Sequence, residues 1–126
     1  MAKGIHHVGL AVNSVDEVAS FLEEIFEAKL TDYQMETPEF FSRMVQVGQG
    51  LFELLEPRGE NGLIERFLKA NGEGIHHVSI LIDDLDKMIE ICEKKGMRVL
   101  GRRFIHPKSA HGVLIELVPA NELQRG

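Results

Sequence analysis

Two adjacent histidines stand inside the string GIHHV, which occupies residues 4–8 and is repeated letter for letter at residues 74–78. Imidazole is both an acid–base group near neutral pH and a common metal ligand. Each copy lies within an apolar run that is typical of a buried strand. The repeat therefore places two pairs of chemically active side chains at equivalent positions of two similar segments.

Alternation along a strand selects one histidine from each pair, because successive side chains point to opposite faces of a sheet. His7 shares its face with Gly9 and Ala11, whose small side chains leave room for a cavity. His77 shares its face with Ser79. The other histidine of each pair lies on the bulky aliphatic face, which should pack under a helix. We therefore expect His7 and His77 to be the functional pair.

Two glutamates are the charges within the otherwise apolar strands LFELL and VLIELV, at matching places in the two halves; they are Glu53 and Glu116. Burial of an unpaired carboxylate is costly, so another group should neutralise each of them. Two neutral imidazoles and two carboxylates suit one divalent cation such as cobalt, zinc, nickel or manganese. The predicted metal ligands are His7, Glu53, His77 and Glu116.

Each of these side chains, taken alone, has a structural interpretation. A histidine in a strand is usually a hydrogen-bonded structural group, and an outward glutamate on an edge strand needs no metal. The four residues together, one imidazole and one carboxylate in each repeated half, favour a metal site.

The elements around these residues repeat as well. After the first GIHHV an apolar strand runs to Val12, and Ser14 with Glu17 forms a capping-box pattern that predicts the start of a helix. Two further strands are expected at about 40–47 and at 51–57. The expected apolar face of the helix comprises Val15, Val18, Ala19, Leu22, Ile25 and Phe26.

The second half has the same order. A strand runs to Ile82, Asp83 or Asp84 caps a helix, and strands are expected at 102–108 and 113–119. With 126 residues, of which 44% are hydrophobic, the chain suits one compact domain, 1–126. Its predicted parts are module one at 1–60, a connecting helix at 61–73 and module two at 74–126. The apolar face of the connecting helix comprises Leu63, Ile64, Phe67 and Leu68.

Charge and cysteine content restrict the classes of protein. A net charge of −6 provides no basic surface for duplex nucleic acid or an anionic membrane. The apolar runs are far shorter than the roughly 20 residues that span a bilayer, and the N-terminus lacks a signal-peptide pattern. The single cysteine, Cys92, fits a reducing compartment and lies on the predicted buried face of the second helix, so we expect it to pack in the core. The sequence predicts a cytoplasmic protein without nucleic-acid or membrane partners.

The segment HPKSAHGVLIEL at residues 106–117 is the most specific motif of the chain. Together with the paired HHV strands and the glutamate in the last strand of each half, it resembles the vicinal oxygen chelate superfamily and, within it, the methylmalonyl-CoA epimerases. The resemblance covers nearly the whole chain. It implies an α+β fold in which two tandem βαβββ modules form a half-open eight-stranded β-barrel around a metal site, usually in a homodimer. It also implies one metal ligand from the first strand and one from the last strand of each module, at the four positions named above.

The activity implied by this resemblance is that of an isomerase, a metal-dependent epimerase that interconverts (2R)- and (2S)-methylmalonyl-CoA by α-proton abstraction through a metal-stabilised enolate. Racemisation at one carbon requires a proton to be removed from one face and returned on the other, so two acid–base groups are needed. Glu116 or Glu53 is expected to be one of them. Glu39 is expected to be the second, since similar epimerases carry a glutamate in this region. The cationic candidates for binding the CoA phosphates are Lys108, Arg102 and Arg103.

Two departures from the pattern matter. Relatives sometimes carry glutamine at the position of Glu53, so a glutamate adds negative charge to the site. Relatives also usually place a Gly-rich loop where this chain has only Gly101 and Arg102, a pair that can close a tight hairpin. Loss of that loop would remove part of the active-site wall. The alternatives are therefore a glyoxalase I-type lactoylglutathione lyase, with the same metal ligands, or a non-enzymatic small-molecule-binding protein with the same fold.

Overall fold

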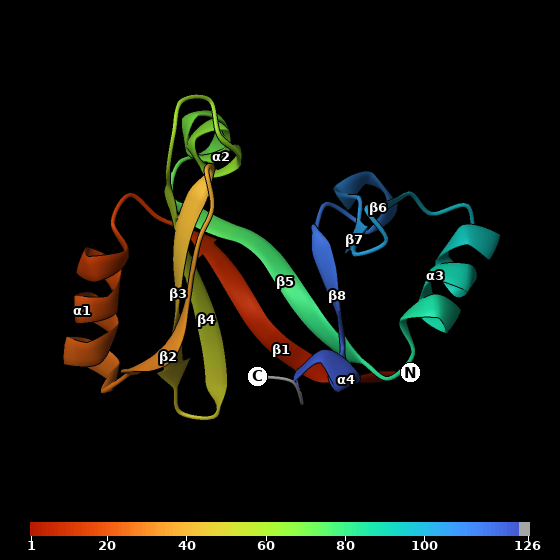
Figure 1. Ribbon diagram of the computed structural model, residues 1–126, viewed down its shortest axis with the longest axis horizontal. Coiled ribbons are helices and arrows are strands. Elements are labelled where there is room, and N and C mark those ends of the chain that lie inside the picture. The colour runs from red at the N-terminus through yellow and green to blue at the C-terminus, as the bar shows by residue number, and fades with distance from the viewer. Residues whose placement is uncertain (124–126) are drawn as a thin grey trace. The chain divides into compact units, whose positions relative to one another are not determined.

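The structure, a computed structural model, describes residues 1–123 (Figure 1). The predicted repeat of a strand, a helix and three strands is confirmed. The first copy consists of β1 (Ala2–Ala11), α1 (Val15–Phe26), β2 (Lys29–Glu36), β3 (Phe40–Val47) and β4 (Gly50–Pro57). The second copy consists of β5 (Gly74–Ile82), α3 (Leu85–Lys94), β6 (Val99–Leu100), β7 (Phe104–Ile105) and β8 (Ile115–Pro119). Helix α2 (Leu63–Asn71) connects the copies, and α4 (Ala120–Leu123) follows β8.

The eight strands form one open mixed sheet in the order β2-β3-β4-β1-β5-β8-β7-β6. In each copy the first strand pairs in parallel with the last, β1 with β4 and β5 with β8, and the remaining pairs within the copies are antiparallel. By backbone contacts the chain forms two compact units, one of residues 7–76 and the other of residues 1–6 with 77–126. No helix within residues 1–123 combines the length and apolar character that crossing a membrane requires.

Helix α1 covers one face of the β3–β4 pair in the unit of residues 7–76 (Figure 1). The predicted cap is confirmed, because the Ser14 hydroxyl oxygen accepts a hydrogen bond from the Glu17 backbone N–H at 3.2 Å. The buried core there comprises Val12, Val15, Ala19, Leu22, Ala28, Val45 and Leu54. Ile25 and Phe26, at the end of the predicted apolar face, are 58% and 56% exposed. They lie in the last turn of the helix, where more than half of each side chain is exposed.

Helix α2 packs on the same unit through Ile64, which is fully buried against Ala11 and Leu55. Phe67 and Leu68 pack partly against this cluster, as predicted. Leu63 does not, because it is 41% exposed at the first position of the helix.

Helix α3 packs on the unit of residues 1–6 and 77–126. Asp84 is the residue that caps it, accepting a hydrogen bond from the Lys87 backbone N–H at 3.1 Å. Ile89 and Cys92 are buried with Ile82 and Leu117 in the core of this unit. Burial raises the pKa of the Cys92 thiol, which keeps it protonated and supports its predicted role in packing.

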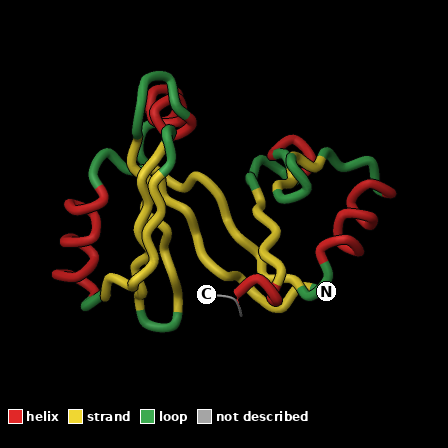
Figure 2. Tube along the Cα trace, in the orientation of Figure 1, coloured by secondary structure: helices red, strands yellow, loops and turns green. Residues whose placement is uncertain are grey.

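The strand expected at 102–108 is much shorter than predicted (Figure 2). Only Phe104–Ile105 pairs in the sheet, and a 3₁₀ turn follows at Pro107–Ser109. Pro107 carries no N–H with which to continue a strand ladder. Gly101 and Arg102 close the preceding hairpin with φ angles of 56° and 57°, and the Arg103 N–H bonds to the Leu100 carbonyl oxygen at 3.0 Å. The connection between β6 and β7 is therefore a tight three-residue turn, Gly101–Arg103.

Candidate metal centre

The first predicted pair of ligands is formed within the unit of residues 7–76. His7 lies on β1 and Glu53 on the parallel neighbouring strand β4, where Gly9 is the register partner of Glu53. The His7 Nε2 atom is 3.3 Å from Glu53 Oε1. His7 is 6% exposed and Glu53 is 8% exposed, so both groups are almost withdrawn from water. Glu53 is therefore buried beside an imidazole, and its role as a metal ligand stays a prediction.

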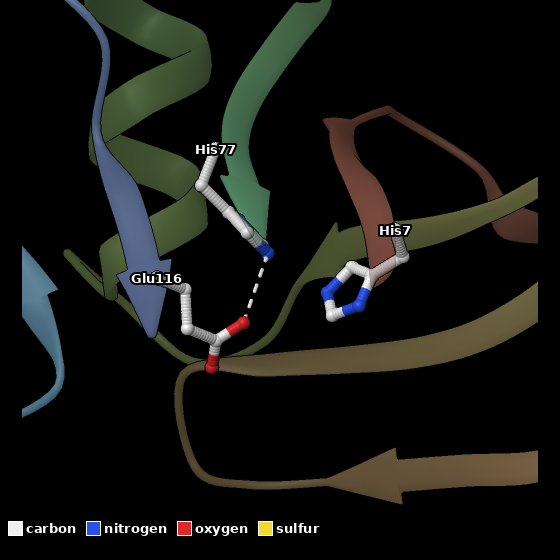
Figure 3. Close-up of side chains that lie close together, drawn as sticks. All are labelled: His7, His77 and Glu116. Atoms are coloured by element: carbon white, nitrogen blue, oxygen red, sulfur yellow. Dashed lines mark ion pairs between the residues drawn. The ribbon is translucent and has the colours of Figure 1, made fainter. Parts of the chain in front are cut away.

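The second pair is formed within the other unit. His77 lies on β5 and Glu116 on the parallel strand β8, where Ser79 is the register partner of Glu116. The His77 Nε2 atom is 3.7 Å from Glu116 Oε1, the ion pair drawn as a dashed line in Figure 3. His77 is 5% exposed, whereas the Glu116 side chain is 26% exposed.

The two pairs have the same construction. In each, the glutamate is opposite the residue two positions after the histidine. Residues i and i+2 of a strand share a face, so this register places the carboxylate diagonally beside the imidazole on one face of two neighbouring strands. The duplicated sequence thus produces a duplicated imidazole–carboxylate pair.

Ser79 adds a contact that the sequence interpretation missed. Its hydroxyl donates a hydrogen bond of 2.5 Å to Glu116 Oε1. From the sequence, Ser79 was identified only as a residue that shares a strand face with His77. The contact depends on the parallel register of β5 and β8, which the sequence alone does not give. The equivalent residue of the other unit, Gly9, has no side chain.

The donor chemistry of these residues fits a divalent cation. Neutral imidazole nitrogens and carboxylate oxygens are the usual ligands of zinc, cobalt, nickel and manganese. One unit offers His77 and Glu116 as such donors (Figure 3). The other unit offers His7 and Glu53. These histidines and glutamates suggest a divalent metal site.

Glu39 has a defined structural contact. Its Oε1 atom accepts a hydrogen bond from the Leu63 N–H at 3.0 Å, at the first turn of α2, and lies 3.9 Å from Arg66 Nη2. The helix needs this external cap because its N-cap residue, Gly62, makes no side-chain capping bond. A Cβ at Gly62 would lie 2.8 Å from the Arg58 carbonyl oxygen, so a larger capping residue does not fit there.

The three predicted CoA-binding cations lie near the β6–β7 hairpin, and two have carboxylate partners. Arg102 Nη2 is 2.6 Å from Asp86 Oδ1. Arg103 binds Glu122 through both terminal nitrogens, and this hydrogen bonding raises the pKa of Arg103. Lys108 is exposed at the 3₁₀ turn that follows His106. All three belong to the same unit, and their role toward phosphate stays a prediction.

The fold and the paired strands define a class of protein. Residues 6–115 match the Glyoxalase/Bleomycin resistance protein/Dioxygenase superfamily, and the chain belongs to this superfamily.

Within the superfamily, the chain is similar to several methylmalonyl-CoA epimerases. It is 32% identical to the mitochondrial methylmalonyl-CoA epimerase of Homo sapiens, over 92% of this chain and 73% of the human protein. The crystal structure of methylmalonyl-CoA epimerase from Mycobacterium tuberculosis matches with a TM-score of 0.86 and 30% identity, over 99% of this chain and 93% of that one. A methylmalonyl-CoA epimerase in complex with methylmalonyl-CoA and ammonium matches with a TM-score of 0.85 and 26% identity, over 95% of this chain and 96% of that one.

Proposed function

We propose that the protein is an epimerase that interconverts (2R)- and (2S)-methylmalonyl-CoA and requires a divalent metal ion. The observation that carries the proposal is the similarity of the chain to methylmalonyl-CoA epimerases over 92% of its length, at 32% identity. The two imidazole–carboxylate pairs, of which all but Glu116 are buried, supply the groups that the chemistry needs.

The reaction requires removal of a proton from a carbon between a carboxylate and a thioester. This proton is only weakly acidic, so the negative charge that develops on the substrate oxygens must be stabilised. A divalent cation would act there as a Lewis acid toward those oxygens. We propose that His7, Glu53, His77 and Glu116 hold this cation, which is cobalt, zinc, nickel or manganese. Because Glu53 is a carboxylate rather than an amide, two negative side chains in this set would balance the charge of the cation.

The proton transfers need two acid–base groups at the reacting carbon. In the proposed mechanism Glu116 or Glu53 is one of them, and Glu39 is the other. Glu39 would remove or return a proton only after its carboxylate exchanges the Leu63 N–H for the substrate. The exposed position of Glu39 leaves its side chain free to rotate for that exchange.

The CoA portion of the substrate requires cationic groups for its phosphates. In our proposal Lys108, Arg102 and Arg103 supply them. Lys108 is exposed, whereas both arginines would exchange a carboxylate partner for a phosphate. The resemblance to the superfamily also predicts a homodimer, a prediction that sedimentation at micromolar concentration can check.

Proton exchange at C2 of methylmalonyl-CoA tests the function directly. In deuterated water with added cobalt, we expect the wild-type protein to incorporate deuterium at C2 and to leave a glutathione hemithioacetal unchanged. Removal of the metal with a chelator should abolish exchange, and cobalt should restore it. Turnover of the hemithioacetal without exchange would instead support the lyase, and a protein that stays empty of metal and catalyses neither reaction would support the binding protein.

A matched pair of variants shows whether the activity depends on the predicted face of the strand. His77→Asn removes a buried imidazole that lies 3.7 Å from Glu116, and we expect it to lower the exchange rate by at least about 100-fold. His76→Asn changes the neighbouring residue on the opposite face, where the His76 ring packs edge-on against Phe67. We expect His76→Asn to keep its activity. Equal loss in both variants would contradict the assignment of His77.

A further inference from the structure

We propose that Ser79 is a positioning residue of the candidate metal centre, which holds the Glu116 carboxylate in the orientation in which it binds the cation. This inference rests on the proposed function, because it concerns a side chain that acts through one of the proposed ligands. Neither the duplicated histidines nor the motif of residues 106–117 points to this role.

The burial of Ser79 makes its hydrogen bond significant. Ser79 is 0% exposed, and its hydroxyl donates to Glu116 Oε1 at 2.5 Å. A buried hydroxyl without a partner would be destabilising, whereas a hydrogen bond to an ionised group is among the stronger kinds in proteins. The register of β5 and β8 places the two residues directly opposite each other, so the backbone itself fixes the contact.

The bond restricts the part of Glu116 that is otherwise least constrained. The terminal torsion of a glutamate is broad and roughly two-fold, so its two oxygens exchange places easily when nothing holds them. An ionised carboxylate offers two oxygens with about four acceptor sites, so the bond to Ser79 leaves Oε2 and a further site on Oε1 for a cation. Groups that hydrogen-bond to a metal ligand orient it in this way and tune its affinity.

The two glutamates differ in burial and in their distance from the neighbouring histidine. Glu53 is the more buried, with its side chain 10% exposed, and its Oε1 atom is 3.3 Å from His7. Glu116 is 26% exposed, and its Oε1 atom is 3.7 Å from His77. Glu53 faces Gly9, which has no side chain, whereas Glu116 faces Ser79, whose hydroxyl holds its Oε1 atom.

The test compares two buried serines. Ser79→Ala removes the bond to Glu116. Ser42→Ala is the matched control, because Ser42 on β3 is also 0% exposed and its hydroxyl has no hydrogen-bond partner among residues 1–123. Cobalt(II) affinity is measured for the metal-free proteins by competition with a chelator, and the visible absorption of bound cobalt reports its coordination. We expect Ser79→Ala to weaken binding by about 10- to 100-fold and to change the spectrum, and Ser42→Ala to leave both unchanged.

A double-mutant cycle separates positioning from a general effect on folding. If Ser79 acts through Glu116, Ser79→Ala should have no further effect on cobalt affinity in a Glu116→Ala background, where no side-chain oxygen remains to accept from Ser79. If Ser79→Ala alone does not fold, as judged by thermal unfolding, Ser79→Thr keeps the hydroxyl and should bind cobalt within about threefold of wild type, since the orienting bond is retained.

Four outcomes would overturn the inference. They are wild-type affinity in Ser79→Ala, equal losses in Ser79→Ala and Ser42→Ala, an undiminished effect of Ser79→Ala in the Glu116→Ala background, and loss of binding in a folded Ser79→Thr. In each of these cases the wild-type protein still binds cobalt, so the proposed function stands. A wild-type protein that binds no cobalt would overturn the proposed function and the inference together.

Discussion

At the scale of single residues, alternation along two strands identified the more buried histidine of each pair. His7 and His77 are buried, whereas His6 and His76 are only partly so. Simple alternation suffices here because both segments are regular strands, in which successive side chains point to opposite faces. The contacts of Ser79 with Glu116 and of Glu39 with Leu63 could not be predicted in this way. They join residues far apart in the sequence and depend on strand register and on the position of a helix end.

Glu39 has two possible roles, and one substitution separates them. Glu39→Gln keeps an oxygen that can accept from the Leu63 N–H, but an amide cannot take up the substrate proton. We expect this variant to lower proton exchange at C2 by at least about 100-fold while its unfolding temperature stays close to that of wild type. Deuterium incorporation and thermal unfolding are the measurements.

Glu39→Ala is the companion variant, because it removes both the acid–base group and the cap of α2. It should lose activity to the same extent and also unfold at a lower temperature, since loss of a helix cap costs about 1 kcal/mol. Full activity in Glu39→Gln would show that Glu39 only caps the helix.

At the scale of elements, the capping residues predicted where helices begin. The apolar spacing did not predict which side chains of the last turn are buried. Ser14 and Asp84 cap α1 and α3 as the capping patterns indicated. The spacing of Ile25 and Phe26 correctly placed them on the apolar side of α1, but they are exposed. Periodicity reports which side chains share a face of a helix, whereas coverage depends on how far the neighbouring strands extend. The short β7 followed from Pro107, a residue whose effect on a strand was visible in the sequence.

The β6–β7 turn allows a test of backbone conformation with a matched control. Gly101 has a φ of +56° and Gly74 does not have a positive φ, yet a Cβ at either position would meet no atom within 4 Å. Gly101→Ala should therefore lower the free energy of unfolding by about 1 kcal/mol, because an L-residue is disfavoured in the left-handed region. Gly74→Ala should leave it unchanged or raise it slightly. Urea unfolding of both variants measures the difference, and equal effects would contradict the assigned turn.

At the scale of the whole molecule, the repeat in the sequence corresponds to a repeat in topology. Each copy contributes a strand, a helix and three strands, with its first and last strands paired in parallel. The copies differ in the length of two strands, since β6 and β7 span two residues each while β2 and β3 span eight. Two similar halves were predictable from the repeated string GIHHV, and the reduced hairpin of the second copy was indicated by its short connection at Gly101 and Arg102 and by Pro107.

Metal binding should stabilise the whole molecule if the four proposed ligands act together. A cation that binds only the folded protein adds about 2.7 kcal/mol at a free concentration 100 times its dissociation constant, which corresponds to a rise of roughly 8–13 °C in the unfolding temperature of a chain of this size. We expect cobalt to produce this rise and a chelator to reverse it, as followed by thermal unfolding.

Magnesium is the control for that measurement, because a net charge of −6 attracts any divalent cation to the surface. Magnesium prefers oxygen ligands and keeps much of its water, so a site with two imidazoles should bind it poorly. Cobalt should therefore raise the unfolding temperature far more than magnesium at the same concentration and ionic strength. Equal shifts would mean that surface charge, and not the paired histidines and glutamates, accounts for the stabilisation.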